Sequence, residues 1–463
     1  MQARFATAMH SIIAAAKTNN TSNSTAPLRI AVAYSGGLDS SVLLQLCALY
    51  AQQNQISLMA FHVHHGLSPN ADDWALHCQQ QCSQLGIPFE VAHVQLGSTQ
   101  GDGLEAAARK KRYAALGQLC VAHQIDILLT AHHQDDQAET MLLQMLRGAG
   151  VAGLCGMQQS HYAAGLLGST TLILARPLLS LARTELETCV EQHAISHIQD
   201  ESNADPRYTR NALRLEIMPL LAQHFPGFQT RFARTAQHAQ SALYLLEQLA
   251  EQDYQQCLTE PGSSALNVLA LQLLPEERID NVLRFWIATY DVQMPSSARL
   301  AEIRKQLLHA RADAQVCVKH GPIEVHRYRS QLSIASCAQP EPEPVRFQWQ
   351  GEASLAFPGF SGSLHFIDAL APGQFGIERS YLLAQQLELR PRQGGERLKL
   401  AANRPTRDMK SHYQSHAIPY WQRERLPFVF AADNTLLFAS GIGINGLLQV
   451  EGSAAVGLRW QAD

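Results

Sequence analysis

Between Leu28 and about Ile195, short runs of apolar and β-branched residues alternate with longer segments whose apolar residues recur every three or four positions. The short runs predict strands, which lie at 28–34, 56–63, 89–94, 126–131 and 171–175. The longer segments, such as 39–53 and 104–123, predict helices. This alternation is typical of βαβ units and predicts a doubly wound α/β domain with a parallel sheet. In such a domain, ligands bind beyond the carboxyl ends of the strands.

The pattern changes after Pro226, where residues 230–258 predict one long amphipathic helix. Strand-like runs follow at 316–320, 323–328 and 331–336, and alternating prolines and glutamates then indicate an extended linker. We therefore expect a doubly wound α/β domain, a mainly helical middle domain and a β-rich C-terminal domain. The expected boundaries are an N-terminal extension at 1–27, the α/β domain at 28–225, the middle domain at 226–338, a linker at 339–346 and the C-terminal domain at 347–463.

The amino-acid composition predicts the cellular compartment of the protein. The chain has 463 residues, 46% of them apolar, which is enough for several cores. Its nine cysteines show no paired pattern, which predicts a reducing cytoplasmic location without disulfides. Cys78 and Cys82 have helical spacing but no second pair, so we expect buried apolar side chains rather than zinc ligands. No apolar run approaches the roughly 20 residues of a membrane span.

The extension at 1–27 carries two basic and no acidic residues, as transit peptides do. We favour a short helix followed by a flexible Ser/Thr/Asn linker.

The segment at 31–41 joins the first strand to the first helix through Ser35, Gly36 and Gly37. A helix that begins there leaves unpaired N–H groups at the positive end of its dipole, which favours an anion. Glycine admits positive φ and lets an oxygen ligand approach closely. A Walker-type loop would place Lys-Ser/Thr after the last glycine, whereas Asp39 stands here. The sequence therefore predicts a loop that holds a diphosphate.

Titratable side chains lie where the second and fourth predicted strands end. They are His62, His64 and His65 in the first case, and His132, His133, Asp135, Asp136 and Glu139 in the second. The carboxyl ends of parallel strands meet at one edge, so both groups are expected to face one ligand. Carboxylates in a first helical turn can act as caps, but three acids in five positions suit either Mg²⁺ beside phosphate or a cationic substrate. Zinc held by the histidines is disfavoured, because no ligand set has zinc spacing.

Two helical faces carry further predictions. One apolar face is expected to be buried, and consists of Ala138, Met141, Leu142, Met145 and Leu146. In the preceding helix, Arg112 interrupts an apolar stripe, so its guanidinium should pair with phosphate or carboxylate or, alternatively, reach water. Polar and basic residues before the domain boundary are expected to border a substrate cleft, and include Asp200, Asn203, Tyr208, Arg210, Asn211 and Arg214.

Charge is segregated within the chain. Residues 390–425 carry nine Lys/Arg and three Asp/Glu, a net +6, whereas the whole chain has a formal charge of −4. Tyr413, Tyr420 and Trp421 lie among these basic residues. Aromatic rings stack on unpaired bases and cations bind phosphates, so this segment predicts an RNA-binding surface. A solvated basic face without a partner is the alternative.

The motif SGGLDS at 35–40, between a strand and a helix, resembles the pyrophosphate loop of the ATP pyrophosphatases. HVHHGL, EAAARKKRY, TAHHQDDQAET with RGAG, and DESNADPRYTRN follow in order. With these motifs the chain resembles the tRNA(Ile)-lysidine synthetases, and residues 390–430 more loosely resemble that family's C-terminal tRNA-binding domain.

The resemblance implies a ligase that joins L-lysine to C2 of the first anticodon cytidine of tRNA(Ile) with anticodon CAU. ATP is consumed with Mg²⁺, AMP and pyrophosphate are released, and codon specificity changes from AUG to AUA. The implied catalytic residues are Asp39, Arg112, His133, Asp136 and Glu139. The nucleotide would be held by Ser35, Gly36, Gly37, Leu38, Asp39 and Ser40, and Mg²⁺ by Asp39 and Asp135. The substrates would contact Asp135, Asp136, Glu139, Asn203, Arg210, Arg397, Lys410, Trp421 and Arg423.

Three other functions stay open on the sequence. A tRNA thiolase would need a reactive or cluster-binding cysteine set, and no C-x-x-C pair occurs. Amidating relatives that use ammonia lack a basic RNA-binding domain. A non-catalytic RNA-binding protein with a relict loop is a third possibility. The oligomeric state is open, with a homodimer as one option, and no membrane partner is expected.

Overall fold

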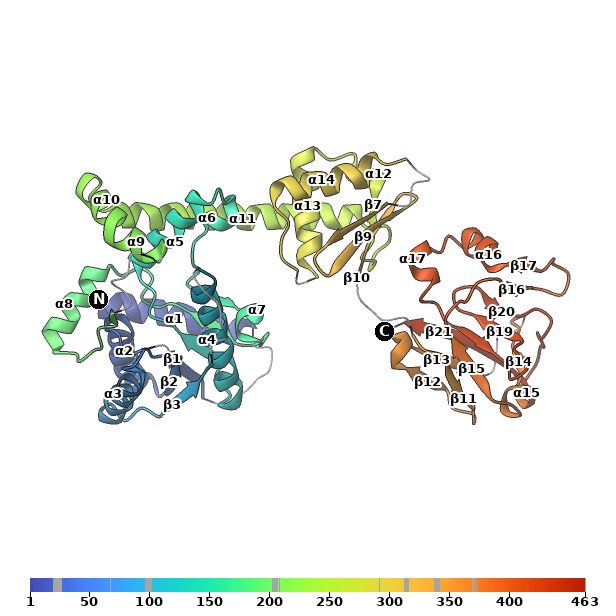
Figure 1. The fold of residues 1–463 in the computed structure, drawn as a ribbon, viewed down its shortest axis with the longest axis horizontal. Helices are drawn as coiled ribbons and strands as arrows, with labels where there is room; N and C mark the ends of the chain where they lie inside the picture. The colour runs from blue at the N-terminus through green and yellow to red at the C-terminus, as the bar shows by residue number, and fades with distance from the viewer. Residues whose placement is uncertain are drawn as a thin grey trace. The chain divides into compact units, whose positions relative to one another are not determined.

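The computed structural model describes residues 1–19, 27–66, 68–95, 102–201, 207, 209–290, 292–311, 316–336, 342–368, 371 and 373–462. Two compact units are present, Met1–Asp253 and Tyr254–Asp463. The helix α11 begins in the first unit and ends in the second (Figure 1). Among the described helices, none combines the length and apolar character needed to cross a bilayer.

The first unit is built on a six-stranded sheet in the order β3-β2-β1-β4-β6-β5. The strands are β1 (Arg29–Ala33), β2 (Ser57–His64), β3 (Phe89–His93), β4 (Ile127–Leu129), β5 (Ser160–Tyr162) and β6 (Ile173–Ala175). Five of them run parallel, and β5 pairs antiparallel with β6 at the edge. The predicted parallel α/β sheet is confirmed. The edge strand β5 was not predicted, because its short Ser-His-Tyr core lacks an apolar run.

Helices cover both faces of this sheet (Figure 1). The helices of the first unit, the last of which continues into the second unit, are α1 (Gln2–Asn19), α2 (Leu38–Asn54), α3 (Ala71–Gln84), α4 (Asp102–Ala122), α5 (Gln134–Leu146), α6 (Val151–Leu154), α7 (Ala164–Leu167), α8 (Arg183–His193), α9 (Thr209–Ala212), a π-helical turn (Leu213–Ile217), α10 (Met218–His224) and α11 (Phe228–Cys257). In β1, Ile30 and Val32 pack in the core beneath α1, α2 and α8, whereas Ala31 packs beneath α4 and α7. Burial on both faces explains why the strands are continuous apolar runs.

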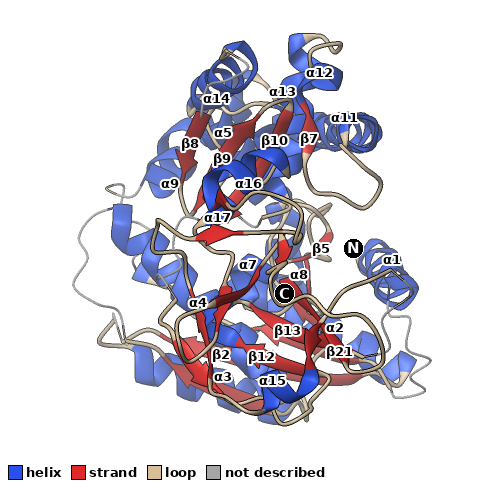
Figure 2. Cartoon of the chain, turned by 90° about the vertical axis from the view of Figure 1, so that its right-hand side faces the viewer, coloured by secondary structure: helices blue, strands red, loops and turns tan. Residues whose placement is uncertain are grey.

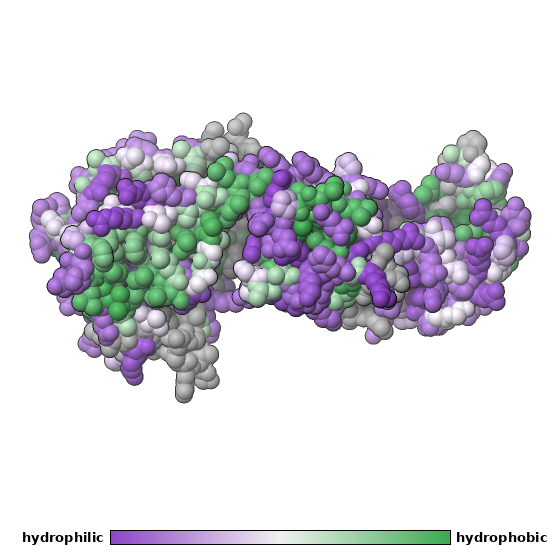
Figure 3. Space-filling model, turned by 90° about the horizontal axis from the view of Figure 1, so that it is seen from above, coloured by the Kyte–Doolittle hydropathy of each residue, from purple (hydrophilic) through white to green (hydrophobic). Residues whose placement is uncertain are grey.

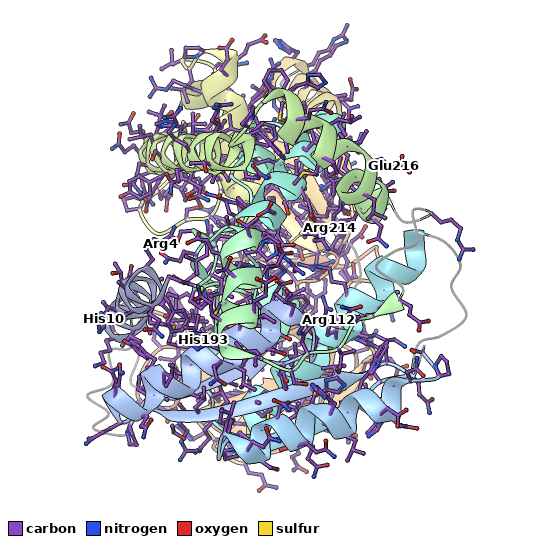
Figure 4. All side chains as sticks on the ribbon, turned by 90° about the vertical axis from the view of Figure 1, so that its left-hand side faces the viewer. Arg4, His10, Arg112, His193, Arg214 and Glu216 are labelled. Carbon is purple, nitrogen blue, oxygen red and sulfur yellow. The ribbon has the colours of Figure 1, made fainter. Side chains whose placement is uncertain are left out.

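The helix expected in the N-terminal extension is present and belongs to the α/β core. Phe5, Met9 and Ile12 of α1 are buried against α2, where the Phe5 ring meets Tyr50 edge-on at 6.1 Å. Arg4 forms an ion pair with Glu185 of α8 (Figure 4). The linker expected after this helix lies largely outside the described residues. The first unit therefore includes α1 in its hydrophobic core.

Phe5→Ala tests this packing. Removing a buried aromatic side chain costs about 3 kcal/mol in the free energy of unfolding, because apolar contacts are lost and a cavity is left. We expect the first unit to unfold at a lower midpoint concentration of urea, with unfolding monitored by circular dichroism. Ser11→Ala, at an exposed position of the same helix, is the control and should leave the midpoint unchanged. Equal midpoints for Phe5→Ala and wild type would show that α1 does not stabilise the unit.

Two sequence predictions about helix faces had different outcomes. Cys78 and Cys82 are fully buried in the α/β core, as expected for small apolar side chains. The apolar face of α5 is buried only in its first part, at Ala138 and Met141. Met145 and Leu146 are 52% and 72% exposed, so their predicted burial is wrong. They lie in the last turn of α5, beyond the residues that pack on α11. Apolar residues lie at the surface in the view from above as well (Figure 3).

The second unit begins with a region of helices and one antiparallel sheet. Its elements are β7 (Leu266–Asn267), α12 (Val268–Leu271), α13 (Glu276–Ala288), α14 (Ser297–His309), β8 (Val316–His320), β9 (Ile323–Tyr328) and β10 (Gln331–Ser336). The sheet order is β7-β10-β9-β8, with helices against it (Figure 2). The last three strands have the residues that the sequence predicted. Val318, Ile323 and Val325 share a core with Trp286 of α13 and Leu300 of α14.

The remainder of this unit is β-rich, as predicted. Its elements are β11 (Val345–Phe347), β12 (Ser354–Phe357), β13 (Gly362–Ile367), β14 (Ile377–Glu378), α15 (Arg379–Leu383), β15 (Leu387–Arg390), β16 (Arg397–Leu398), β17 (Arg407–Asp408), α16 (Met409–Ser415), α17 (Tyr420–Arg423), β18 (Phe428–Phe430), β19 (Leu436–Ala439), β20 (Gly443–Ile444) and β21 (Ala455–Ala462). Alternate residues of β13, Leu364 and Phe366, enter a core with Leu389 and Val429. Period-two alternation of this kind is typical of a sheet with one buried face.

Candidate active site

The glycine loop lies between β1 and α2, at the edge of the sheet where the strands end. Gly36 has a φ of +82°, which favours glycine, and a Cβ there would lie 2.4 Å from Ile198 Cδ1 and 2.8 Å from Cys78 Sγ. Packing against the protein therefore requires Gly36 to lack a side chain. Gly37 precedes the first turn of α2, and a Cβ there would meet only Ser35 Oγ, at 3.6 Å. Gly37 is thus the glycine at which a phosphate oxygen could approach the helix N-terminus.

The serine hydroxyls mainly hold the shape of this loop. Ser40 Oγ donates to the Gly37 carbonyl at 3.0 Å, and Ser41 Oγ donates to the Gly36 carbonyl at 3.2 Å. Ser35 is exposed, and its hydroxyl lies 3.0 Å from Ser40 Oγ. Ser35 is therefore the hydroxyl of the three that reaches the solvent side of the loop.

Asp39, in the first turn of α2, is held by an arginine from a distant part of the chain. Arg183 Nη1, in the first turn of α8, donates to both carboxylate oxygens of Asp39 at 2.5 Å. Arg183 Nε also donates to Glu187 at 3.1 Å. Burial raises the pKa of Asp39, while the charges of His133 and Arg183 act to lower it. The carboxylate next to the loop is thus paired with a cation.

His133 lies among three carboxylates at the start of α5. Its Nε2 is 3.7 Å from Asp39 Oδ2 and 3.4 Å from Asp136 Oδ2, and its Nδ1 is 3.7 Å from Asp135 Oδ2. The side chain is 3% exposed. Burial acts to lower the pKa of His133, but Asp135, Asp136 and Asp39 outweigh it and raise the pKa above its usual value. The imidazolium is therefore stabilised at this position.

Asp136 and Glu139 are bound by two arginines from the segment that precedes α10. Arg214 donates from Nε to Glu139 Oε1 at 2.7 Å and from Nη2 to Asp136 Oδ1 at 3.1 Å. Arg210 Nε donates to Glu139 Oε2 at 3.0 Å. Glu139 is 1% exposed, and these two guanidiniums supply the hydrogen bonds that compensate for the burial of its carboxylate. Arg214 belongs to a π-helical turn, a type of irregularity that is frequent at functional sites (Figure 4).

Asp136 serves as a helix cap and faces the site. Its Oδ2 accepts the backbone N–H of His133 at 3.0 Å, while its Oδ1 faces Arg214. Burial acts to raise the pKa of Asp136, but the charges of His133, His132 and Arg210 lower it to about 2. The carboxylate is thus ionised at neutral pH.

Asp135 is engaged by backbone and side-chain donors from two other helices. Its Oδ2 accepts the N–H of Arg183 at 2.9 Å, and its Oδ1 accepts Gln229 Nε2 of α11 at 3.2 Å. Burial acts to raise its pKa, but His133 and the Arg183 N–H lower it overall. Asp135 therefore links α5 to α8 and α11.

The histidines at the end of β2 form a separate group. His62 Nδ1 lies 2.9 Å from the Tyr34 carbonyl oxygen, and His64 Nε2 lies 3.0 Å from Asp72. Burial, and then the charge of Arg112, lower the pKa of His65 to about 4. Arg112 lies on α4 with its guanidinium carbon 5.6 Å from the Tyr113 ring (Figure 4). The structure thus places Arg112 beside the β2 histidines.

The C-terminal residues predicted to bind substrate have two kinds of environment. Arg397 and Lys410 are exposed. Arg423 Nε donates to the Ile418 carbonyl at 2.8 Å, and Trp421 stacks on His326. Tyr413 is fully buried, so the prediction that its ring offers a stacking surface is wrong. It lies in the core beneath α16, where Phe428 and Leu398 surround it.

Two predicted residues, Asn203 and Tyr208, lie outside the described part of the chain. Sequence reasoning missed Arg183, which pairs with Asp39. Arg183 could have been found from its position shortly after the strand β6, because residues that follow parallel strands gather at the edge of the sheet where ligands bind. The chain thus brings the glycine loop, Asp39, His133, Asp136, Glu139 and three arginines to one edge.

This arrangement can hold a polyphosphate and position a cation. The N-terminus of α2 and the cationic Arg183 suit phosphate oxygens. Asp39 provides oxygen ligands of the kind that Mg²⁺ takes beside phosphates. The fold and the site define a nucleotide-binding domain of the pyrophosphate-loop class, and residues 9–221 match the family model described as a PP-loop domain.

Two further family models match the second unit. Residues 266–333 match the TilS substrate binding domain, and residues 387–460 match the TilS substrate C-terminal domain. The tRNA(Ile)-lysidine synthase of Burkholderia pseudomallei is 38% identical over 94% of this chain and 93% of its own length. That of Coxiella burnetii is 37% identical over 96% of this chain and 93% of its own length. The chain belongs to the tRNA(Ile)-lysidine synthase family.

Solved structures show weaker likeness. A U34-tRNA thiolase from Methanococcus maripaludis is 18% identical, with a TM-score of 0.37 over 50% of this chain and 79% of that chain.

Proposed function

We propose that this chain, an ATP-dependent ligase of its family, joins L-lysine to C2 of the first anticodon cytidine in tRNA(Ile) with anticodon CAU. The observation that supports this most is the cluster of Asp39, His133 and Asp136 beside the glycine loop, with contacts of 3.4–3.7 Å around the imidazole. One set of residues can then serve both ATP and an amine. The product would read AUA rather than AUG.

The first step is attack of the cytosine O2 on the α-phosphorus of ATP, from which pyrophosphate leaves. Ser35, Gly37 and the N-terminus of α2 would hold the leaving pyrophosphate. Arg183, whose guanidinium lies beside the loop on Asp39, would offset part of the charge of the pyrophosphate. Asp39, the carboxylate in the first turn of the helix after the loop, would hold Mg²⁺, whose charge would help to neutralise the phosphates. Arg112 would offset negative charge at the α-phosphate, or at the RNA that approaches the α-phosphate.

The second step is attack of the lysine ε-amine on the adenylated C2, from which AMP leaves. The ammonium must be bound and must lose a proton first. Asp136 Oδ1, which faces Arg214 at 3.1 Å, is placed to accept an ammonium instead. Glu139 would act by holding Arg210 and Arg214, and His133 would take the proton. Asp135, whose oxygens accept two hydrogen bonds, would assist Mg²⁺ only by releasing one of them.

The proton-transfer role makes the lysine-transfer step pH dependent. Neutral His133 is the acceptor, and its pKa is raised, so the rate should rise with pH up to that pKa, above 6.5, and then level off. Asp135→Asn removes a charge that stabilises the imidazolium, so it should move the midpoint to lower pH. Single-turnover lysine incorporation between pH 5.5 and 9 measures both profiles. An unchanged midpoint in Asp135→Asn would remove His133 as the titrating group.

Binding of tRNA is proposed for the exposed basic side chains of the C-terminal region. Arg397→Ala and Lys410→Ala should each lower the slope of log affinity against log salt by about 1, because one phosphate contact is lost. Arg346→Ala is the control, since this exposed arginine pairs with Glu388 at 3.2 Å. Filter binding at several salt concentrations measures the slopes. If the control lowers the slope as much, the effect is one of net charge alone.

A single assay tests the proposed reaction. The chain is incubated with ATP, Mg²⁺, radiolabelled L-lysine and an unmodified tRNA transcript bearing CAU. The proposal is supported if the RNA retains the label and if this labelling disappears when the first anticodon cytidine is changed. Release of AMP with a sulfur donor but not with lysine would favour a thiolase. Cys78 next to the loop disfavours this rival, because burial raises its pKa to about 12 and keeps the thiol protonated.

The cytoplasmic location, the homodimer and the residue roles stay predictions. Size-exclusion chromatography with light scattering measures the oligomeric state directly.

A further inference from the structure

The outward face of the β8–β9 hairpin gathers three side chains of metal-ligating type. In the antiparallel register, Cys317 is opposite His326 and Lys319 is opposite Glu324. Residues two apart on one strand share a face, so all four side chains lie on the same side of the sheet. The other side, with Val318 and Val325, forms the hydrophobic core. The hairpin register therefore places one thiol, one carboxylate and one imidazole together.

The imidazole of His326 is buried and points into this group. The side chain is 3% exposed, and its Nε2 is 3.1 Å from Glu324 Oε2. This contact is an ion pair, and Nε2 makes no hydrogen bond within the described part of the chain. A buried polar nitrogen without a hydrogen bond is costly. A ligand between the two atoms would satisfy both.

The other atoms of these side chains are already oriented. His326 Nδ1 lies 3.1 Å from the Tyr420 hydroxyl, which fixes the ring and leaves Nε2 toward the cluster. Glu324 Oε1 is 3.0 Å from Lys319 Nζ, so Oε2 is the oxygen that faces the imidazole. Partners of this kind orient the ligands in many metal sites.

We propose that Cys317, Glu324 and His326 bind one divalent transition-metal ion of the zinc class. Their ligand atoms all lie within 4.8 Å of one another. Tetrahedral coordination at bond lengths of 2.0–2.3 Å needs ligand atoms about 3.3–3.8 Å apart, so a side-chain shift of about 1 Å closes the site. Cys317 is exposed and can make that shift. The combination of S, N and O ligands suits zinc, and solvent water completes the four ligands. The thiol proton passes to solvent on binding.

The site would join the hairpin to α17 of the C-terminal region. Trp421 stacks on the His326 ring with a centroid distance of 4.3 Å and an interplanar angle of 13°. Tyr420 contacts the same ring edge-on at 5.7 Å. An ion on Nε2 therefore fixes a ring that both aromatic residues contact, which stabilises α17 against the hairpin. This binding is independent of lysine ligation.

Cobalt titration of the full-length chain tests the proposal. The chelator-treated protein is titrated with Co²⁺ under reducing conditions, and the thiolate-to-cobalt absorption in the near ultraviolet is recorded. One equivalent is expected to produce the band, and Zn²⁺ is expected to remove it by displacement. Trp421 fluorescence should fall in parallel, because the ion lies next to the stacked ring, and Trp421→Phe should remove that change while keeping the band.

Variants assign the ligands. Cys317→Ser should lose the band, and His326→Gln should weaken Co²⁺ binding at least about 100-fold. His320→Gln, on the same hairpin but outside the cluster, should bind as the wild type does. Far-ultraviolet circular dichroism checks that each variant is folded. Absence of the band in the wild type, or a band that persists in Cys317→Ser, would overturn the proposal.

Discussion

Asp39→Asn is expected to slow tRNA-dependent release of AMP by at least about 100-fold, the size of effect seen when a group that stabilises transition-state charge is removed. Asparagine keeps the shape and can still accept a hydrogen bond from Arg183, but it loses the charge that would bind Mg²⁺ beside the loop. The Mg²⁺ concentration needed for half-maximal rate should rise in the variant. AMP release at several Mg²⁺ concentrations measures both effects.

Glu187→Gln separates this role from simple neutralisation of Arg183. Glu187 also contacts that guanidinium, at 3.1 Å, but from the exposed side of α8. If Asp39 only balances the charge of Arg183, the two variants should behave alike. We expect Glu187→Gln to turn over within about twofold of the wild type. Turnover by Asp39→Asn within the same range at low Mg²⁺ would exclude a metal-binding role.

Glu139→Ala is expected to lower the free energy of unfolding by about 3 kcal/mol and to reduce lysine incorporation at least about 100-fold. The stability loss follows because Arg210 and Arg214 would keep their charges in a partly buried place and would lose their hydrogen bonds to Glu139, with Asp136 as the carboxylate that remains. The loss of incorporation follows because Arg214 also donates to Asp136, so its guanidinium would move. Urea unfolding and radiolabelled lysine measure the two effects.

A double variant separates the structural effect from the functional one. In Glu139→Ala/Arg214→Ala, the guanidinium that lost its two hydrogen bonds to Glu139 is gone as well, so part of the stability should return. Incorporation should stay low, because neither group is left to position Asp136. If incorporation recovers together with stability, Glu139 matters for folding alone. Glu216→Gln, an exposed acid in the same π-helical turn, is the matched control for a lost charge (Figure 4).

Some site residues could be found from the sequence because they follow parallel strands, whereas the ion-pair partners of these residues could not. Asp39, His133 and Asp136 each follow a recognisable apolar strand, and parallel strands bring their carboxyl ends together. Arg183 pairs with Asp39 across 144 residues of sequence. Local periodicity carries no information about such a partner, so the direction of the guanidinium could not be read from the segment around it.

The hydrophobic pattern of the sequence also could not predict which single side chains are buried. Tyr413 lies among basic residues in sequence, yet its ring is in the core beneath α16, because the helix turns that face toward Leu398 and Phe428. Met145 and Leu146 continue the apolar period of α5 but lie in its last turn, beyond the residues that pack on α11. A helical period defines a face and leaves open how much of that face another element covers.

The sequence by itself determined the five parallel strands of the α/β sheet, the glycine loop and the acids at its edge, because hydrophobic period, helix-terminus chemistry and the direction of parallel strands are local properties. The tertiary structure decided which charges pair. It gave Arg183 to Asp39, and Arg210 and Arg214 to Glu139. It also set the opposition of Cys317 and His326 across a hairpin. These pairings depend on the register and packing of elements far apart in the chain, where many partners compete and only the folded geometry selects one.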